Sequence, residues 1–252
     1  MLKIEDLKVA VNGKVILNGV NLEVPDGKTH ILFGPNGSGK TSLLMTIMGF
    51  ERYRVLGGKI YFKDVDITNL PIDERAKMGI GMSFQRPPSV DGLKLNDLLV
   101  HMGTQKEEVG KLAGEMKFDQ FLDRDINVGF SGGEIKRSEL LQLMVQQPDL
   151  MLFDEPESGV DLENIALIGN AINCLIKGYD PEGHGYCLRK ARESRKRSSL
   201  IITHTGFILD YVDADEANVL YDGKMVCWGN PKEILREISD HGYGECIRCL
   251  GM

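Results

Sequence analysis

The segment from Gly34 to Thr41 constrains the fold of this chain more than any other. It reads GPNGSGKT, follows the continuously apolar residues 29–33 and precedes SLLMTIMGF, whose apolar spacing suits a buried helix. Between a strand and a helix, the pattern G-x-x-x-x-G-K-[ST] indicates a phosphate-binding loop, because its glycines let successive backbone N–H groups face a phosphate. A glycine-rich turn with an ordinary lysine is the alternative. The residues predicted to contact nucleotide here are Gly34, Pro35, Asn36, Gly37, Ser38, Gly39, Lys40, Thr41 and Ser42.

Hydrolysis of a nucleotide also requires acidic groups near the phosphates. The apolar residues 150–153 end in Asp154 and Glu155, which a parallel strand would place at its carboxyl end. We expect Lys40 to reach the β and γ phosphates, Thr41 to ligate Mg²⁺, and Asp154 to hold the ion through water. Glu155 would orient or deprotonate the attacking water. By itself, such an acidic pair is as often a helix-capping turn.

Hydrophobic patterning predicts an α/β fold. Strands are expected over 29–33, 80–84, 150–153 and 200–203, and helices over 42–50, 93–121, 134–145 and 162–176. Partial alternation over 7–11, 15–24 and 59–67 favours an antiparallel sheet, and residues 218–228 a hairpin turning at Asp222-Gly223. The order of these elements predicts a parallel sheet with helices on both faces and a smaller antiparallel layer.

Composition excludes several classes of function. The chain of 252 residues carries a formal charge of -7, which argues against nonspecific binding to nucleic acid or anionic lipid. No apolar stretch reaches the length of a membrane span, and the first residues hold no apolar signal core, so we expect a cytoplasmic protein without direct membrane insertion. Five scattered cysteines fit a reducing compartment rather than a disulfide framework.

Five motifs in a fixed order resemble the ATP-binding-cassette (ABC) ATPases. Between the phosphate loop and the acidic pair lies FSGGE, residues 130–134, with Gln85 upstream and His204 downstream. The resemblance covers about residues 2–243. It implies a single P-loop domain over 1–252, with a RecA-like catalytic core and antiparallel β layer in 1–85 and 146–252 and a helical subdomain in 86–145.

The same resemblance implies how ATP and Mg²⁺ are held. In the family, two chains sandwich two ATP molecules head to tail, and the signature of one chain covers the nucleotide of the other. The signature here is Ser131, Gly132, Gly133 and Glu134. Gln85 would sense Mg²⁺ and water, which makes Thr41, Gln85 and Asp154 the metal-associated residues. His204 would contact the γ-phosphate, and SGVD (158–161) would lie at the dimer seam.

Within that family, the chain resembles archaeal-type ATPases of SUF iron–sulfur cluster assembly. The matching stretches are SGGEIKRSELLQLMVQQPDLMLFDEPESGVD, FQRPPSVDGL, NVGFSGGE, LDYVDADEANVLYDGKMVCWGNP and HGYGE. The resemblance implies an ATP-dependent homodimer that moves a SufB/SufD-like β-helical scaffold protein. The scaffold would dock on residues 86–129 through apolar side chains, half of which could instead be core: Leu95, Leu98, Leu99, Met102 and Phe118.

Three segments depart from the family pattern or carry weak signals. Many transporter cassettes have an adenine-stacking aromatic residue before Gly13, but this chain has Asn12, so adenine would rest on aliphatic side chains such as Val15. Residues 178–199 read as an insertion with a basic run that we interpret as a solvated helix face rather than a site for an acidic partner or RNA. Cys246 and Cys249 have metal-ligand spacing, repeated by His184 and Cys187, yet structural or idle cysteines are the better interpretation.

Three other functions compete with this interpretation. A subunit of an ABC membrane transporter would use the same cassette with a different partner. DNA-repair and translation cassettes need a long coiled-coil insertion or two cassettes in one chain, which 252 residues do not hold. A binding module without chemistry would not need Lys40, Asp154 and Glu155 together, so slow, partner-stimulated hydrolysis is expected.

Overall fold

The computed structural model describes residues 1–177 and 197–244 and is built on two main sheets. The larger sheet has six strands in the order β12-β11-β3-β10-β9-β6. Its strands β11, β3, β10, β9 and β6 are parallel, and β12 pairs antiparallel with β11. They are β3 (Thr29–Phe33), β6 (Ile80–Ser83), β9 (Leu150–Asp154), β10 (Ser198–Ile202), β11 (Glu216–Tyr221) and β12 (Lys224–Gly229).

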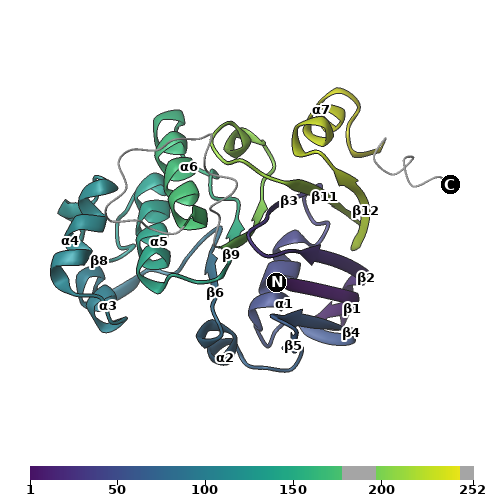
Figure 1. The fold of residues 1–252 in the computed structure, drawn as a ribbon, viewed down its shortest axis with the longest axis horizontal. Coiled ribbons are helices and arrows are strands. Elements are labelled where there is room, and N and C mark those ends of the chain that lie inside the picture. The colour runs from purple at the N-terminus through teal and green to yellow at the C-terminus, as the bar shows by residue number, and fades with distance from the viewer. Residues whose placement is uncertain (178–196, 245–252) are drawn as a thin grey trace.

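The second sheet is antiparallel and lies at the opposite end of the molecule from helices α3 and α4 (Figure 1). Its order is β2-β1-β4-β5, formed by β1 (Leu2–Val11), β2 (Lys14–Val24), β4 (Arg54–Phe62) and β5 (Val65–Asp66). A two-stranded sheet of β7 (Val90–Lys94) and β8 (Asp125–Ile126) lies in the helical part of the chain.

The helices are connected to the strands as the α/β prediction requires. Around the phosphate loop and the antiparallel sheet are α1 (Lys40–Met48) and α2 (Ile72–Lys77). The helical part contains α3 (Leu95–His101), α4 (Lys106–Glu115), the 3₁₀ turn η1 (Asp119–Phe121) and α5 (Gly132–Gln146). The remaining helices are α6 (Leu162–Lys177), the 3₁₀ turn η2 (Phe207–Asp210) and α7 (Pro231–His241).

Both faces of the parallel sheet are buried, which explains its continuously apolar strands. In β9, Leu150 and Leu152 join the core formed with α1 and the antiparallel sheet, whereas Met151 and Phe153 face the core of α5, α6 and the helical part. This alternation gives the sheet a helical layer on one side and α1 with the antiparallel layer on the other. The predicted fold class is confirmed.

The stretch predicted as helical over 93–121 is helical in large part, but it is not one continuous helix. Residues 90–94 form β7, and the helical pattern then splits into α3, α4 and η1. Gly103, two residues after the end of α3, has φ 102°, a left-handed conformation that prevents the helix from continuing. The alternation of apolar and charged residues was the same on both sides of this break, so periodicity alone did not reveal it.

The strand predicted over 59–67 begins and ends earlier than expected, since β4 runs from Arg54 to Phe62. Strand β4 ends at Phe62, and Lys63 and Asp64, both with positive φ, form a two-residue turn into β5. The predicted hairpin over 218–228 is confirmed: Asp222 and Gly223, with φ of 45° and 71°, connect β11 to β12.

The insertion predicted over 178–199 ends too late. Ser198 and Ser199 already belong to β10, and Arg197 is partly buried, with its guanidinium donating to the carbonyl of Leu175 at 3.2 Å. Burial also lowers the pKa of Arg197. Residues 178–196 lie outside the described residues, as does the pair Cys246 and Cys249. Across 1–177 and 197–244, no helix has the length and apolar character needed to cross a membrane.

Candidate active site

The predicted site residues converge at the carboxyl ends of four parallel strands. The phosphate loop follows β3, Gln85 follows β6, Glu155 follows β9 and His204 follows β10. Neighbouring parallel strands end at the same edge of a sheet, so residues far apart in sequence meet there. This edge is where open α/β sheets bind their ligands.

The phosphate loop leaves backbone donors open at the start of α1. Gly34 has φ 154°, and a Cβ at this position would lie 2.2 Å from the carbonyl oxygen of Leu220, so only glycine fits. Gly39 is the N-cap of α1 and supplies no side-chain cap, so the first N–H groups of the helix remain available to an anion. The hydroxyl of Ser38 is buried without a partner among the described residues.

Lys40 lies in this loop as a buried cation. Its Nζ donates to the carbonyl oxygens of Gly34 at 2.8 Å and Pro35 at 3.0 Å. Burial lowers the pKa of Lys40 to about 8, because the neighbouring carboxylates of Glu155 and Asp154 only partly offset the loss of solvation. A phosphate entering the loop would supply the negative charge that this ammonium lacks.

The pKa of Lys40 predicts a pH-dependent affinity for ATP. In the free protein, Lys40 loses its proton as the pH rises through about 8, whereas a bound phosphate raises that pKa again. Binding above pH 8 should therefore take up a proton, and affinity should fall by up to about tenfold per pH unit. Isothermal titration at pH 9 in two buffers of different ionisation enthalpy measures this uptake. Equal heats in both buffers would contradict the assignment.

Asp154 and Thr41 form a site whose chemistry fits Mg²⁺. The hydroxyl of Thr41 donates to Oδ1 of Asp154 at 3.2 Å, while Oδ2 of Asp154 is fully buried without a partner among the described residues. Burial raises the pKa of this carboxyl. An unpaired buried carboxylate oxygen beside a hydroxyl is a ligand set that a hard divalent cation satisfies. Within the described part of the chain, no group of three or more His, Cys, Asp or Glu residues forms a metal site.

Glu155 is held between Gln85 and His204. The amide Nε2 of Gln85 donates to Oε2 of Glu155 at 2.6 Å, and Nε2 of His204 lies 2.6 Å from Oε1. Glu155 has φ 50°, an uncommon conformation for a non-glycine residue, which turns the chain away from the direction of Asp154 at the end of β9. Gln85 and His204, predicted from separate motifs, thus both contact the carboxylate of Glu155.

Burial and the nearby Lys40 lower the pKa of His204. At neutral pH the ring is therefore neutral, and the proton must be on Nε2 for the ring to donate to Glu155. Nδ1 is then an acceptor. Two neutral donors therefore fix the orientation of the Glu155 carboxylate.

The signature turn is exposed at the start of α5. Ser131 is the N-cap, with its hydroxyl accepting from the N–H of Glu134 at 3.4 Å and its own N–H donating to the Glu134 carboxylate at 2.7 Å. This capping box makes Glu134 a structural support for the turn. Gly132 packs so closely against the carbonyl oxygen of Gly159 that a Cβ would lie 2.3 Å from it. The signature and the predicted dimer-seam segment 158–161 are therefore in contact within one chain.

Asn12 has a structural explanation. Asn12 and Gly13, with φ of 50° and 80°, form the two-residue turn between β1 and β2. Asparagine followed by glycine is the preferred pair for such a turn, so the position suits the hairpin rather than adenine stacking. The start of β2 lies beside the phosphate loop, since a Cβ on Gly39 would contact Leu17.

Sequence reasoning missed Glu157, which supports the His204 turn. Oε1 of this buried carboxylate accepts from the hydroxyls of Thr203 and Thr205, the latter at 3.2 Å, and these two residues flank His204. The N–H of Gly206 donates to the Thr203 hydroxyl at 2.9 Å. Burial raises the pKa of Glu157. The only sequence signal was an acidic residue two positions beyond Glu155.

Removing this support should slow hydrolysis. We expect Glu157→Ala to lower kcat by about tenfold. Glu157 supports the turn of His204, which orients the general base Glu155, and a well-placed general base typically contributes a rate factor of about 10²–10⁴. The KM for ATP should change little, since Lys40 and Thr41 are untouched. Glu157→Gln keeps an accepting oxygen for both threonines and should retain most of the activity. An equal loss of kcat in both variants would show that hydrolysis depends on the negative charge of Glu157 and not on its support of the turn.

A second missed pair connects α5 to the Gln85 segment. The ammonium of Lys136 donates to the carbonyl oxygens of Phe84 and Gln85, and lies 3.4 Å from the carboxylate of Glu139. Glu139 in turn accepts from the N–H of Phe84 at 2.7 Å and the hydroxyl of Ser83 at 3.0 Å. Both charged groups are buried, so the end of β6 cannot move without the signature helix.

Together, the phosphate loop, the Thr41–Asp154 pair and the oriented Glu155 define a P-loop nucleoside-triphosphate hydrolase. Comparison with known proteins identifies the family. A family model described as ABC transporter matches residues 17–158. The probable ATP-dependent transporter SufC of Escherichia coli is 36% identical, with 97% of this chain and 98% of that protein covered.

Further relatives and solved structures agree. An ABC transporter ATP-binding protein of Methanocaldococcus jannaschii is 34% identical over 99% of this chain and 95% of that protein. A nucleotide-free ATP-binding cassette from an ABC transporter superimposes with a TM-score of 0.75 at 25% identity, covering 98% of both chains. The chain belongs to the ABC transporter family of ATPases.

Proposed function

We propose that this ATPase binds MgATP, forms a head-to-tail homodimer, and uses the cycle of binding and hydrolysis to move a scaffold on which iron–sulfur clusters are assembled. One observation carries the proposal. Hydrogen bonds from α5 hold the Gln85 segment beside a surface hollow, and Gln85 in turn contacts the catalytic Glu155. Similarity to SufC along the full chain and the SUF-like stretches around Gln85 and Ser131 support the choice of partner.

Hydrolysis would proceed at the edge where the four strands end. Lys40 and the N–H groups of α1 would bind the phosphates, and Thr41 with Asp154 would hold Mg²⁺. When bound, the ion supplies positive charge that stabilises the phosphoryl oxygens. Glu155 orients a water and accepts its proton as the water oxygen bonds to the γ-phosphorus and the bond to the bridging oxygen of ADP breaks. Gln85 and His204 hold Glu155 for this step.

The second chain would complete the site. ABC ATPases dimerise, and here Ser131 and Gly132 are exposed while Gly133 is buried. An exposed helix N-terminus with a free hydroxyl proton offers donors to a γ-phosphate of a facing chain. Residues 158–161, in contact with Gly132, would form part of the same seam.

The proposed dock is a hollow of about 300 Å³ beside the Gln85 segment. It lies where Pro87 and Pro88 leave that segment and meet α3 and α5. Its apolar lining includes Phe84, Val90, Leu93, Leu98, Met102 and Leu143. Of the apolar residues predicted for a dock, Leu98 and Met102 line this hollow, whereas Leu95, Leu99 and Phe118 are core.

The dock and the catalytic site share one rigid connection. Lys136 and Glu139 bind the backbone of Phe84 and Gln85, and Phe84 and Glu139 both line the hollow. A partner segment seated there would move with α5, and with it the signature turn at the start of that helix. Closure of the dimer on ATP would thus be transmitted to the partner.

A substitution at the C-cap of α3 tests the dock. Met102→Asp should abolish capture of the partner, because burying a carboxylate in the interface leaves a charge without a counterion. Val100, two residues earlier and on α3, is about equally exposed, at 42% against 39% for Met102, but does not line the hollow. Val100→Asp should therefore capture the partner as the wild type does. Both variants should keep the basal ATPase rate, and equal capture by the two would contradict the dock.

An ABC membrane transporter subunit is the second candidate function, favoured by the match to solved transporter cassettes over 98% of the chain. A pull-down from native lysate with the Glu155→Gln chain and MgATP separates the two. Recovery of a β-helical protein that carries iron and sulfide supports cluster assembly. Recovery of a polytopic membrane protein supports the transporter and overturns the scaffold.

A further inference from the structure

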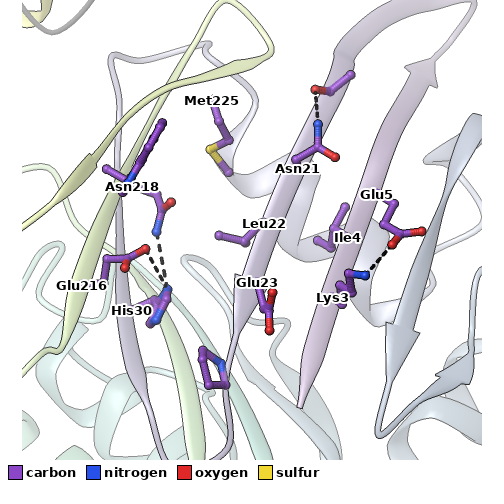
Figure 2. Close-up of a pocket in the computed structure, with 13 residues that line it drawn as sticks. Lys3, Ile4, Glu5, Asn21, Leu22, Glu23, His30, Glu216, Asn218 and Met225 are labelled. Atoms are coloured by element: carbon purple, nitrogen blue, oxygen red, sulfur yellow. Dashed lines mark hydrogen bonds and ion pairs between the residues drawn. The ribbon is translucent and has the colours of Figure 1, made fainter. Parts of the chain in front are cut away.

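A second hollow, of about 680 Å³, lies between the two main sheets and away from the nucleotide edge. The sheets touch where the N–H of Asn18 donates to the carbonyl oxygen of Gly223 at 2.9 Å, and they diverge from there along β2 and β12. Figure 2 shows the resulting groove between β1 and β2 on one side and β11 on the other. We call it the amino-edge groove, lined by Leu22, Glu23, His30, Glu216, Met225 and Trp228.

The groove is closed at the amino ends of the parallel strands. Near Pro25, the hydroxyl of Ser198 donates to the Pro25 carbonyl at 2.9 Å and accepts from the N–H of Gly27 at 3.0 Å. Asp215 accepts from the N–H of Thr29 at 2.9 Å. These bonds fix the rim, so the groove is a preformed feature rather than a gap between loosely packed sheets.

Carboxylates dominate the charge of the groove. Lys3 pairs with Glu5 at 2.6 Å, an ion pair drawn in Figure 2, and lies opposite Glu23 across β1 and β2, so one lysine faces two carboxylates there. Glu216 has no lysine or arginine partner within the described residues. His30 does not compensate for them. Its ring lies 3.4 Å from the amide of Asn218 and 3.9 Å from Glu216, and burial lowers its pKa, so it is neutral at pH 7. The groove therefore carries a net negative charge.

An aromatic residue stands at the mouth of this groove. Trp228 pairs with Asn218 across β11 and β12, and 69% of its side-chain surface is exposed. It is the only tryptophan of the chain. Tryptophan is among the residues that most often anchor an interface, and its ring attracts guanidinium and ammonium groups.

We propose that the amino-edge groove binds an arginine-rich, extended segment of a partner protein. Guanidinium groups pair with carboxylates through two hydrogen bonds and stack on indole rings, so Glu23, Glu216 and Trp228 offer complementary contacts to successive side chains. The apolar floor of Leu22 and Met225 accommodates the methylene stems. A partner held here leaves the nucleotide edge and the dock beside Gln85 unobstructed.

The single tryptophan makes the proposal directly measurable. Titration of the full chain with hexa-arginine peptide should give a saturable change in Trp228 fluorescence that weakens with added salt. Hexa-glutamate should give none. Glu23→Gln with Glu216→Gln should weaken binding by about tenfold or more, because two carboxylates are removed from the contact.

A matched pair of substitutions controls for net charge. Glu74→Gln with Glu107→Gln removes the same charge from two exposed glutamates on α2 and α4, outside the groove, and should leave the affinity unchanged. Calorimetry with Trp228→Ala, which should also bind more weakly, checks that fluorescence reports binding. An unsaturable titration, equal binding of hexa-glutamate, or an equal loss in the control pair would overturn the proposal.

Discussion

The Glu155→Gln chain should bind MgATP as tightly as the wild type yet hydrolyse it about 10²–10⁴ times more slowly. The substitution removes the carboxylate to which the proposed mechanism assigns the proton of the attacking water. It leaves Lys40, Thr41 and Asp154, and their contacts with one another and with the loop, unchanged. Because ATP then persists, the variant should also accumulate as an ATP-bound dimer, visible by size-exclusion chromatography with light scattering.

The matched control for this variant is Glu74→Gln. Glu74 is an exposed glutamate on α2, so the substitution makes the same chemical change away from the strand ends and should leave kcat and KM unaltered. Single-turnover assays with both variants separate chemistry from product release. Hydrolysis by Glu155→Gln at the wild-type rate would show that Glu155 is not the base, whatever its contacts with Gln85 and His204.

The meeting of the predicted site residues at one edge of the parallel sheet was predictable because the patterns that indicate it are local. The phosphate loop needs glycine where a Cβ would strike Leu220, and the strands beneath the site need apolar side chains on both faces. Both requirements restrict consecutive residues of the chain, so each can be recognised in a short stretch of sequence. Gln85, Glu155 and His204 were less obvious singly, but each follows a predicted parallel strand, so topology was enough to bring them together.

Features that depend on distant partners were not predictable in the same way. The support of the His204 turn by Glu157 spans 46 residues, and the bond from Lys136 to Phe84 spans 52. Neither has a spacing that repeats in the sequence. The amino-edge groove is a further example, since it arises from the angle at which two sheets diverge rather than from any motif on one of them.

The helical part shows a different limit. Its apolar residues were recognised, but their division between core and surface was not, because α3 and α4 are short and joined at Gly103. Phe118 packs against Phe121 and Phe130, with ring centroids 4.6 Å and 5.8 Å away. Phe118, which the family resemblance offered for a dock, belongs to this aromatic core, whereas Leu98 and Met102 line the hollow beside the Gln85 segment.

A mixture of two inactive chains should recover activity if each site is shared between two copies. Lys40→Ala removes the cation of the phosphate loop and leaves the signature turn intact. Gly132→Asp places a carboxylate in the signature turn, where even a Cβ would lie 2.3 Å from the oxygen of Gly159, and leaves the phosphate loop intact. Each homodimer should hydrolyse ATP at least about 100-fold more slowly than the wild type.

In a 1:1 mixture, half of the dimers pair one chain of each kind. Such a dimer has one site with an intact phosphate loop facing an intact signature, so the mixture should regain about a quarter of the wild-type rate per chain. Thermal melting and ATP binding by the Gly132→Asp chain establish that it is folded. A mixture that stays as inactive as its components would mean that each chain completes its own site, and the exposed turn at Ser131 would then need another explanation.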